Sequence, residues 1–351
     1  MIMAEDNSYM IPTSIKEVKA LGWDYIDVIL FTGDAFIDHP SFGTAVIARW
    51  LQKHGYRVAV VPQPNWRDDL RDFRKLGAPR LYFGVNSGAM DSMVNHYTAA
   101  KRLRSDDAYT PEGKAGQRPD YAVTVYTKIL KEIYPDIPVV IGGIEASLRR
   151  VTHYDYWQDC LKPSILVDSG ADWLCYGMGE RTMIEFTRAI EAGRNLSDIR
   201  KIPQLGFYMD GKCRLKDAVI LNSYERCCKD KVAFAENFHV VETYANMLQP
   251  PVLVEPVGKG YVQINPTWPP ATQEEMDSFW DLPYTKLPHP RYKGKHIPAF
   301  EMIKFSVNTH RGCFGGCNFC TIAAHQGKFI QSRSEESIIR EITALNKLPG
   351  F

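Results

Sequence analysis

The chain has 351 residues, of which 45% are hydrophobic and 24% are charged, and its formal net charge at pH 7 is +1. This length allows two domains and a large core, and the composition is that of an ordinary soluble globular protein. The balance of 42 basic and 41 acidic residues does not indicate nucleic acid as a partner. No basic start followed by an apolar stretch is found, and no apolar run reaches membrane-spanning length. The sequence therefore predicts a cytoplasmic protein with no membrane partner.

Strand-like and helix-like patterns alternate between residue 24 and about residue 210. Apolar runs that predict buried strands cover 25–31, 57–61, 81–85, 139–141 and 173–176. Helical spacing of apolar residues follows Pro40, recurs along 122–133 and returns after Glu180. Repeated strand–helix units predict an α/β fold, with a parallel, Rossmann-like sheet over residues 1–214 and helices on both of its faces.

Glycine-bearing loops follow four of these strands, at 32–34, 86–88, 142–145 and 177–180. In parallel sheets, ligands bind beyond the carboxyl ends of the strands. The sequence therefore predicts cofactor-binding residues that meet at one edge of the sheet: Gly142, Gly143, Gly177, Gly179 and Glu180. Each glycine-rich loop alone is weak evidence, because such strand ends are common. The long polar insertion at 86–119 is expected to lie over the same edge.

Residues 215–300 have a different pattern, because prolines interrupt every long periodic stretch. This segment is expected to be a connector of turns and short strands that packs on the domains. Residues 301–351 are expected to be a separate unit. In this unit 304–308 alternates as a strand. Ser334 is a good N-cap for a helix with a buried stripe formed by Ile338, Ile339, Ile342 and Leu345.

Three cysteines follow the predicted strand at a Cys-x₃-Cys-x₂-Cys spacing: Cys313, Cys317 and Cys320. Iron–sulfur clusters are held by cysteine thiolates in short loops of this kind, and three thiolates leave one iron of a cubane unclaimed by protein. An open position is typical of a catalytic metal centre. The alternative is a structural zinc site with His310 or His325 as the fourth ligand, in a protein that acts as an interaction scaffold.

The segment 313–320 resembles the signature of the radical S-adenosylmethionine superfamily, Cys-x₃-Cys-x-aromatic-Cys, with Phe319 as the aromatic residue. The resemblance implies a [4Fe-4S] cluster on the three cysteines, with Phe319 beside the cofactors and S-adenosylmethionine on the fourth iron. Reductive cleavage of S-adenosylmethionine then gives methionine and a 5′-deoxyadenosyl radical. The resemblance also implies an external electron donor, such as flavodoxin or ferredoxin. It implies that residues 301–351 begin a (β/α)6 partial barrel.

The order of motifs in the N-terminal half is similar to the cobalamin-binding-type domain that precedes many radical enzymes of this superfamily. The stretches that carry this similarity are 39–43, 55–58, 140–143 and 176–180. Asp38-His39 departs from the Asp-x-His-x-x-Gly motif by which a histidine ligates cobalt. Cobalamin is therefore an open alternative as a cofactor. In that alternative the N-terminal sheet binds cobalamin or a nucleotide, and the chain is not itself a catalyst.

Nearly the whole chain resembles the YgiQ-type radical S-adenosylmethionine proteins, most clearly at 11–14, 64–70, 93–98 and 311–317. This resemblance implies a longer protein that supplies the remaining barrel strands. The chain alone is therefore expected to be inactive. The substrate is left open, because the cofactor carries the difficult chemistry and only the pocket selects what is attacked.

Overall fold

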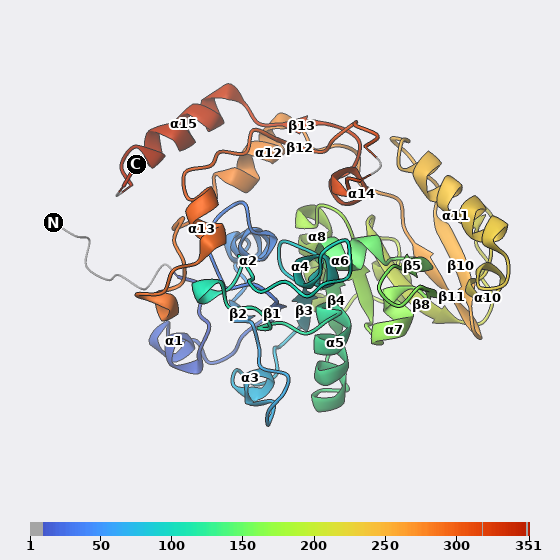
Figure 1. Cartoon of the computed structure of the whole chain (residues 1–351), viewed down its shortest axis with the longest axis horizontal. Coiled ribbons are helices and arrows are strands. Elements are labelled where there is room, and N and C mark those ends of the chain that lie inside the picture. The colour runs from blue at the N-terminus through green and yellow to red at the C-terminus, as the bar shows by residue number, and fades with distance from the viewer. Residues whose placement is uncertain (1–9, 318, 349) are drawn as a thin grey trace.

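The computed structural model of the protein describes every residue except 1–9, 318 and 349. Its centre is a nine-stranded sheet with the order β2-β1-β3-β4-β7-β8-β11-β10-β9 (Figure 1). The first five of these strands are parallel to one another. They are β1 (Val28–Thr32), β2 (Val58–Pro62), β3 (Tyr82–Asn86), β4 (Val139–Gly142) and β7 (Trp173–Cys175). The predicted parallel strands are thus confirmed.

Helices cover both faces of the parallel strands, and this explains why β1 and β2 are buried along their whole length. Val28 and Leu30 belong to one core, with α2 (Gly43–Lys53) and α8 (Glu180–Glu191). Ile29 and Phe31 point to the opposite core, which is formed by α3 (Arg71–Arg74), α5 (Ala122–Ile133) and α7 (Ile165–Ser169). The alternation follows from the two-residue period of a strand.

The sheet continues beyond its five parallel strands, and it includes strands that lie outside residues 1–214. β8 (Leu205–Asp210) pairs antiparallel with β7, and β11 (Gly260–Ile264) pairs antiparallel with β8. β10 (Leu253–Val257) then pairs antiparallel with β11, and β9 (Val219–Ile220) pairs parallel with β10. Residues 215–300 were expected to be a connector, but they contribute three strands to the main sheet. The reason is that Leu253, Val262 and Ile264 complete one of its two cores.

The remaining elements before residue 297 are short, apart from α11 and α12. The helices are α1 (Ile15–Ala20), α4 (Ser92–His96), η2 (Pro111–Gly113), α6 (Gly143–Leu148), α9 (Leu196–Ile199), α10 (Tyr224–Cys227), α11 (Lys231–Tyr244), α12 (Gln273–Trp280) and η3 (Pro290–Tyr292). β5 (His153–Asp155) and β6 (Cys160–Lys162) form a separate antiparallel pair. No helix among the described residues has the length and hydropathy needed to cross a membrane.

The C-terminal segment contains α13 (Pro298–Ile303), β12 (His310–Arg311), α14 (Ile322–Gln326), β13 (Gln331–Ser332) and α15 (Glu335–Leu345). The strand predicted at 304–308 is wrong. Pro298 favours a helix start, α13 runs to Ile303, and irregular chain then leads to β12. β12 and β13 pair antiparallel, and the described part of 301–351 contains no parallel strand. The described residues therefore do not confirm the start of a barrel, which stays a prediction.

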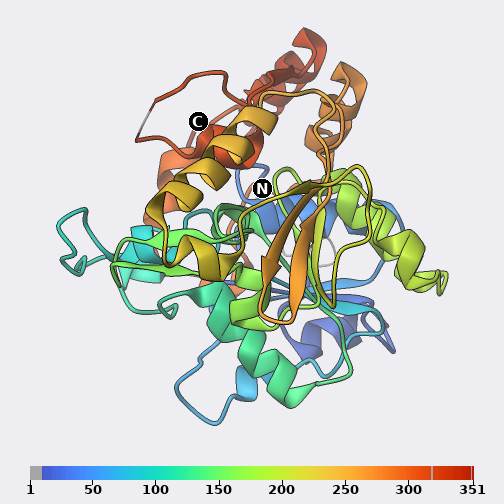
Figure 2. The same cartoon turned by 90° about the vertical axis from the view of Figure 1, so that its right-hand side faces the viewer.

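The C-terminal segment runs over the carboxyl ends of the parallel strands. Figure 1 shows it in orange and red beyond α6 and α8, and Figure 2 shows it beside α11. α14 packs against α6, and Lys328 pairs with Glu242 of α11 at 2.7 Å. The loop with the three cysteines therefore belongs to the same end of the sheet as the glycine-bearing loops.

Candidate functional site

A cavity of about 570 Å³ lies at the carboxyl ends of β3, β4 and β7. Of the residues predicted to bind a cofactor, the five at the strand ends line it: Gly142, Gly143, Gly177, Gly179 and Glu180. Asn86, Met90 and Val94 of the long insertion line it as well. The structure thus brings the predicted strand-end residues together, and a bound cofactor at these residues is still a prediction.

Gly177 is a position in this cavity where the backbone depends on glycine. Its φ is +70°, a left-handed conformation that L side chains rarely adopt. A Cβ atom there would lie 2.8 Å from Nε2 of Gln204 and 3.2 Å from the carbonyl oxygen of His325. The absence of a side chain therefore lets β7 end directly beneath α14.

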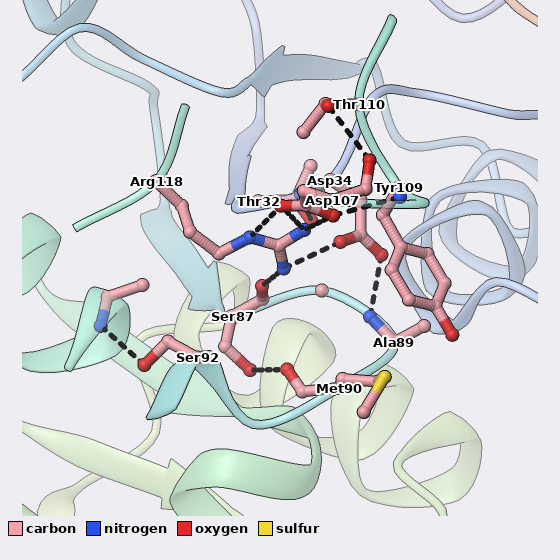
Figure 3. Close-up of polar contacts among 12 residues, drawn as sticks. Thr32, Asp34, Ser87, Ala89, Met90, Ser92, Asp107, Tyr109, Thr110 and Arg118 are labelled. Carbon is pink, nitrogen blue, oxygen red and sulfur yellow. Dashed lines mark hydrogen bonds and ion pairs between the residues drawn. The ribbon is translucent and has the colours of Figure 1, made fainter. Parts of the chain in front are cut away.

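A buried ion cluster holds the insertion 86–119 over the end of β1 (Figure 3). Nη1 of Arg118 lies 2.8 Å from Oδ1 of Asp34, and Nη2 lies 3.0 Å from Oδ2 of Asp107. Nη1 also donates a hydrogen bond of 2.8 Å to the carbonyl oxygen of Ser87. Burial raises the pKa of Asp34 to about 6, although the Arg118 cation opposes this rise.

A second buried group fixes α4 and α6, which border the cavity. Asp91 forms an ion pair with Arg149. Glu145 accepts hydrogen bonds from the backbone N–H of Ser92 at 3.0 Å and of Val123 at 3.0 Å. Burial and the nearby Asp91 raise the pKa of Glu145. These contacts bind the insertion to α6, the helix that follows β4.

The C-terminal segment closes the cavity on the side away from the sheet. Arg311, two residues before the first cysteine of the motif, forms an ion pair with Glu180 at the start of α8. The guanidinium carbon of Arg311 lies 4.5 Å from the centroid of the Trp280 ring. After the cysteines, Thr321 and Ile322 return to the same cavity. Glu180 was predicted to bind a cofactor, and the structure pairs it with Arg311.

His325 is the second contact between this segment and the sheet. Its Nδ1 lies 2.9 Å from Oγ of Ser147 in α6, and the same Oγ accepts a hydrogen bond of 3.0 Å from the N–H of Gly177. Burial and the Arg311 cation lower the pKa of His325 to about 4, so that the imidazole is neutral. Sequence reasoning missed Arg311, Trp280 and Ser147 as parts of the site. Only the position of Arg311 beside the cysteine motif offered a signal.

The three cysteines lie on the outer side of this closure. Cys313 is half-buried, Cys317 and Cys320 are exposed, and all three are free thiols. The N–H of Gly315 donates to Sγ of Cys313 at 3.4 Å, and a Cβ atom at Gly315 would lie 3.8 Å from Sγ of Cys317. The thiols of Cys313 and Cys317 therefore both lie close to Gly315, which has no side chain. Phe319 is 91% exposed and does not line the cavity.

Among the residues that the structure describes, no three Cys, His, Asp or Glu side chains are arranged to hold a metal ion. The described residues therefore form no ready-made metal site, either for a cluster on the three cysteines or for zinc with His310 or His325. The donors nevertheless fit an iron–sulfur cluster in their chemistry, because three free thiols share one short loop. His325 uses its Nδ1 on Ser147, and His310 places its Nδ1 3.0 Å from Oγ1 of Thr309.

The family model described as "Radical SAM N-terminal" matches residues 10–306. The chain belongs to this family. It is 57% identical to a UPF0313 protein of Porphyromonas gingivalis, over 97% of this chain and 54% of that protein. It is 43% identical to the UPF0313 protein YgiQ of Escherichia coli, over 97% of this chain and 54% of YgiQ. The chain therefore spans about half the length of the curated relatives it matches, and the predicted resemblance to YgiQ-type proteins is confirmed.

A solved structure is also similar to this member of the Radical SAM N-terminal family. It is the radical S-adenosylmethionine methyltransferase TsrM from Kitasatospora setae, with cobalamin and a [4Fe-4S] cluster bound. The similarity covers 92% of this chain and 46% of TsrM, with a TM-score of 0.48 and 17% sequence identity. The membership of the chain in the radical S-adenosylmethionine superfamily comes from the family match.

Proposed function

We propose that Cys313, Cys317 and Cys320 hold a [4Fe-4S] cluster, and that the chain is the N-terminal, cluster-bearing part of a radical S-adenosylmethionine enzyme. The observation that supports this most directly is the position of the cysteine loop. It leaves the carboxyl edge of the sheet at Arg311 and returns to it at Thr321, and both residues line the 570 Å³ cavity. When bound, the cluster and S-adenosylmethionine would supply reductive cleavage of a carbon–sulfur bond, giving methionine and a 5′-deoxyadenosyl radical.

The residues of this chain have separable roles in the proposal. The three thiolates supply the protein ligands, and Gly315 leaves room for two of them to approach one another. The Arg311–Glu180 ion pair holds the start of the loop on the sheet. The exposed side of the loop at Cys317 and Cys320 is where an external donor such as flavodoxin or ferredoxin would deliver an electron. In this proposal the complete enzyme encloses S-adenosylmethionine and selects the substrate.

Anaerobic reconstitution with iron and sulfide tests the ligand assignment. We expect the reconstituted chain to bind iron and sulfide and to give the electron paramagnetic resonance signal of a reduced cluster after addition of dithionite. Alanine at any one of the three cysteines is expected to abolish stable iron binding. Cys160→Ala and Cys228→Ala are matched controls, because these two thiols are also free and exposed.

Two results would contradict this proposal. One is retention of iron by the Cys317→Ala variant, and the other is loss of iron from Cys160→Ala. Metal analysis of protein purified without reconstitution separates the cluster from the zinc alternative, in which stoichiometric zinc would depend on the same cysteines.

The cavity supports a second candidate function, the binding of cobalamin or a nucleotide by the N-terminal sheet. Its volume of about 570 Å³ lies within the range of small-molecule sites, roughly 300–1,000 Å³. His39 is fully buried and does not line the cavity, so cobalamin would bind here without that histidine on cobalt. Titration of the chain with cobalamin, followed by absorbance, tests this candidate. Unchanged spectra and no retention of cobalamin on gel filtration would exclude cobalamin as the ligand.

A further inference from the structure

The hydrogen bonds around Ser147 determine which nitrogen of His325 carries the proton. Ser147 is fully buried, and its Oγ accepts a hydrogen bond from the N–H of Gly177 at 3.0 Å. Nδ1 of His325 is the only acceptor that the described residues offer to the Ser147 hydroxyl hydrogen, at 2.9 Å. A neutral imidazole has one protonated nitrogen. Because Nδ1 accepts from Ser147, the proton of His325 is on Nε2.

The Nε2–H group of His325 has no hydrogen-bond partner among the described residues. His325 lines the 570 Å³ cavity and also an adjoining cavity of about 130 Å³. His325 is half-buried and its Nε2 is not a fully buried atom, so this donor is accessible from the cavity and available to a ligand. The structure therefore presents one oriented, neutral donor where the cysteine segment meets the sheet.

The charged groups of the main cavity are paired with one another or with neighbours. Arg311 is the only arginine or lysine among its described lining residues, and it pairs with Glu180. The other acidic residue, Asp91, pairs with Arg149. Much of the remaining wall is apolar and includes Val46, Ile47, Val140, Ile144, Leu148 and Met183. No side chain in this described lining offers an uncompensated charge to an anionic or a cationic ligand.

We propose that the cavity takes a large, uncharged organic ligand, and that Nε2–H of His325 donates a hydrogen bond to a carbonyl, amide or hydroxyl oxygen of that ligand. This inference rests on the cavity being a ligand site, and it narrows the second candidate function, because a nucleotide carries anionic phosphates. It assigns the cavity to a compound different from S-adenosylmethionine, whose amino, carboxylate and sulfonium groups are charged. Ser147 is a positioning residue, because it acts through the tautomer of His325.

Nile red is a suitable probe, because it is uncharged, mostly apolar and carries a carbonyl oxygen, and its fluorescence reports transfer into an apolar site. His325→Asn removes the donor at the Nε2 position while keeping an acceptor for Ser147. His325→Gln restores an N–H near that position. We expect His325→Asn to weaken Nile red binding by about three- to tenfold, the usual effect of one hydrogen bond, and His325→Gln to recover most of the loss. Binding should change little between low and high ionic strength.

Gly43→Leu identifies where the dye binds. Gly43 lines the cavity, and a Cβ atom built on it has no atom within 4 Å, so the variant is expected to fold. If Gly43→Leu leaves dye binding unchanged, the dye binds elsewhere and the cavity is not its site. If Gly43→Leu abolishes binding but His325→Asn does not weaken it, the cavity is a ligand site and the role of His325 is refuted. Iron content after reconstitution should be the same in all of these variants, and it reports separately on the cluster proposal.

Discussion

Replacing Arg118 with methionine gives the strongest test of how the insertion 86–119 is held over the sheet. Arg118 is fully buried between Asp34 and Asp107, whose side chains are 4% and 1% exposed. Methionine is unbranched but shorter than arginine, and it removes the charge while keeping the apolar stem of the side chain. The variant would leave two buried carboxylates without their cation, and the carbonyl of Ser87 without its donor (Figure 3).

Breaking a buried ion pair by removing one partner costs roughly 3–5 kcal/mol, because the remaining charge is buried and uncompensated. We expect Arg118→Met to lower the free energy of unfolding by about this amount near neutral pH. The cost should depend on pH. The pKa of Asp34 is already raised from 3.8 to about 6 in the folded protein, and loss of the Arg118 cation raises it further.

The sign of this dependence follows from proton binding. Between the unfolded pKa and the raised folded pKa, the folded state holds a proton on Asp34 that the unfolded state has released, so stability falls as pH rises through this window. In Arg118→Met the window extends to higher pH. The deficit relative to the wild type should therefore be largest near pH 8 and smaller near pH 5, where Asp34 is neutral in the folded variant.

Urea denaturation followed by tryptophan fluorescence, at about pH 8 and about pH 5, measures this deficit. Arg71→Met is the matched control, because Arg71 pairs with Asp69 at an exposed position and its loss should change stability little. The reasoning would be refuted if Arg118→Met unfolded at the same urea concentration as the wild type. A deficit that grew as the pH was lowered would also refute it.

Three further predictions concern the site and the cysteine segment. Gly33→Ala places a Cβ atom 2.2 Å from the carbonyl oxygen of Ser87, so the loops after β1 and β3 must separate, and we expect a lower melting temperature in calorimetry. Arg311→Met removes the ion pair to Glu180 and the contact with Trp280. Limited proteolysis should then cut the cysteine segment faster, while the circular dichroism of the sheet is unchanged; equal cleavage would count against an anchoring role. Finally, the reconstituted 351-residue chain with dithionite and S-adenosylmethionine should form no 5′-deoxyadenosine above the Cys317→Ala control, because Cys317 and Cys320 are exposed to water.

Local patterns in the sequence determined much of this protein. The apolar runs gave the five parallel strands, because strands covered on both faces must be apolar throughout. The edge at which their glycine-rich ends meet follows from parallel pairing alone, and Gly142, Gly143, Gly177 and Gly179 do share one cavity. Ser334 was expected to cap a helix, and its side chain accepts from the N–H of Ser337 at 3.0 Å.

The contacts that complete the site could not be read from the sequence. Glu180 and Arg311 are 131 residues apart, and Ser147 and His325 are 178 residues apart. No short-range pattern indicates that such pairs meet. The expected buried stripe of α15 was partly wrong for the same reason, since Ile339 and Ile342 are 53% and 43% exposed. Periodicity identifies the apolar face of a helix, but only the surrounding structure decides whether that face is covered.

The same distinction explains why the sequence predicted short strands in residues 215–300 but not their place in the main sheet. Their prolines do break long patterns, yet β10 and β11 pair with each other, and β11 reaches the sheet through β8. A short strand is identified by the neighbour that satisfies its backbone hydrogen bonds, and this neighbour is set by tertiary packing. The sequence by itself determined the cysteine motif and the strand ends. Tertiary structure alone placed the strand ends at one cavity, next to the segment that carries the cysteines, because only the folded chain brings side chains more than a hundred residues apart into contact.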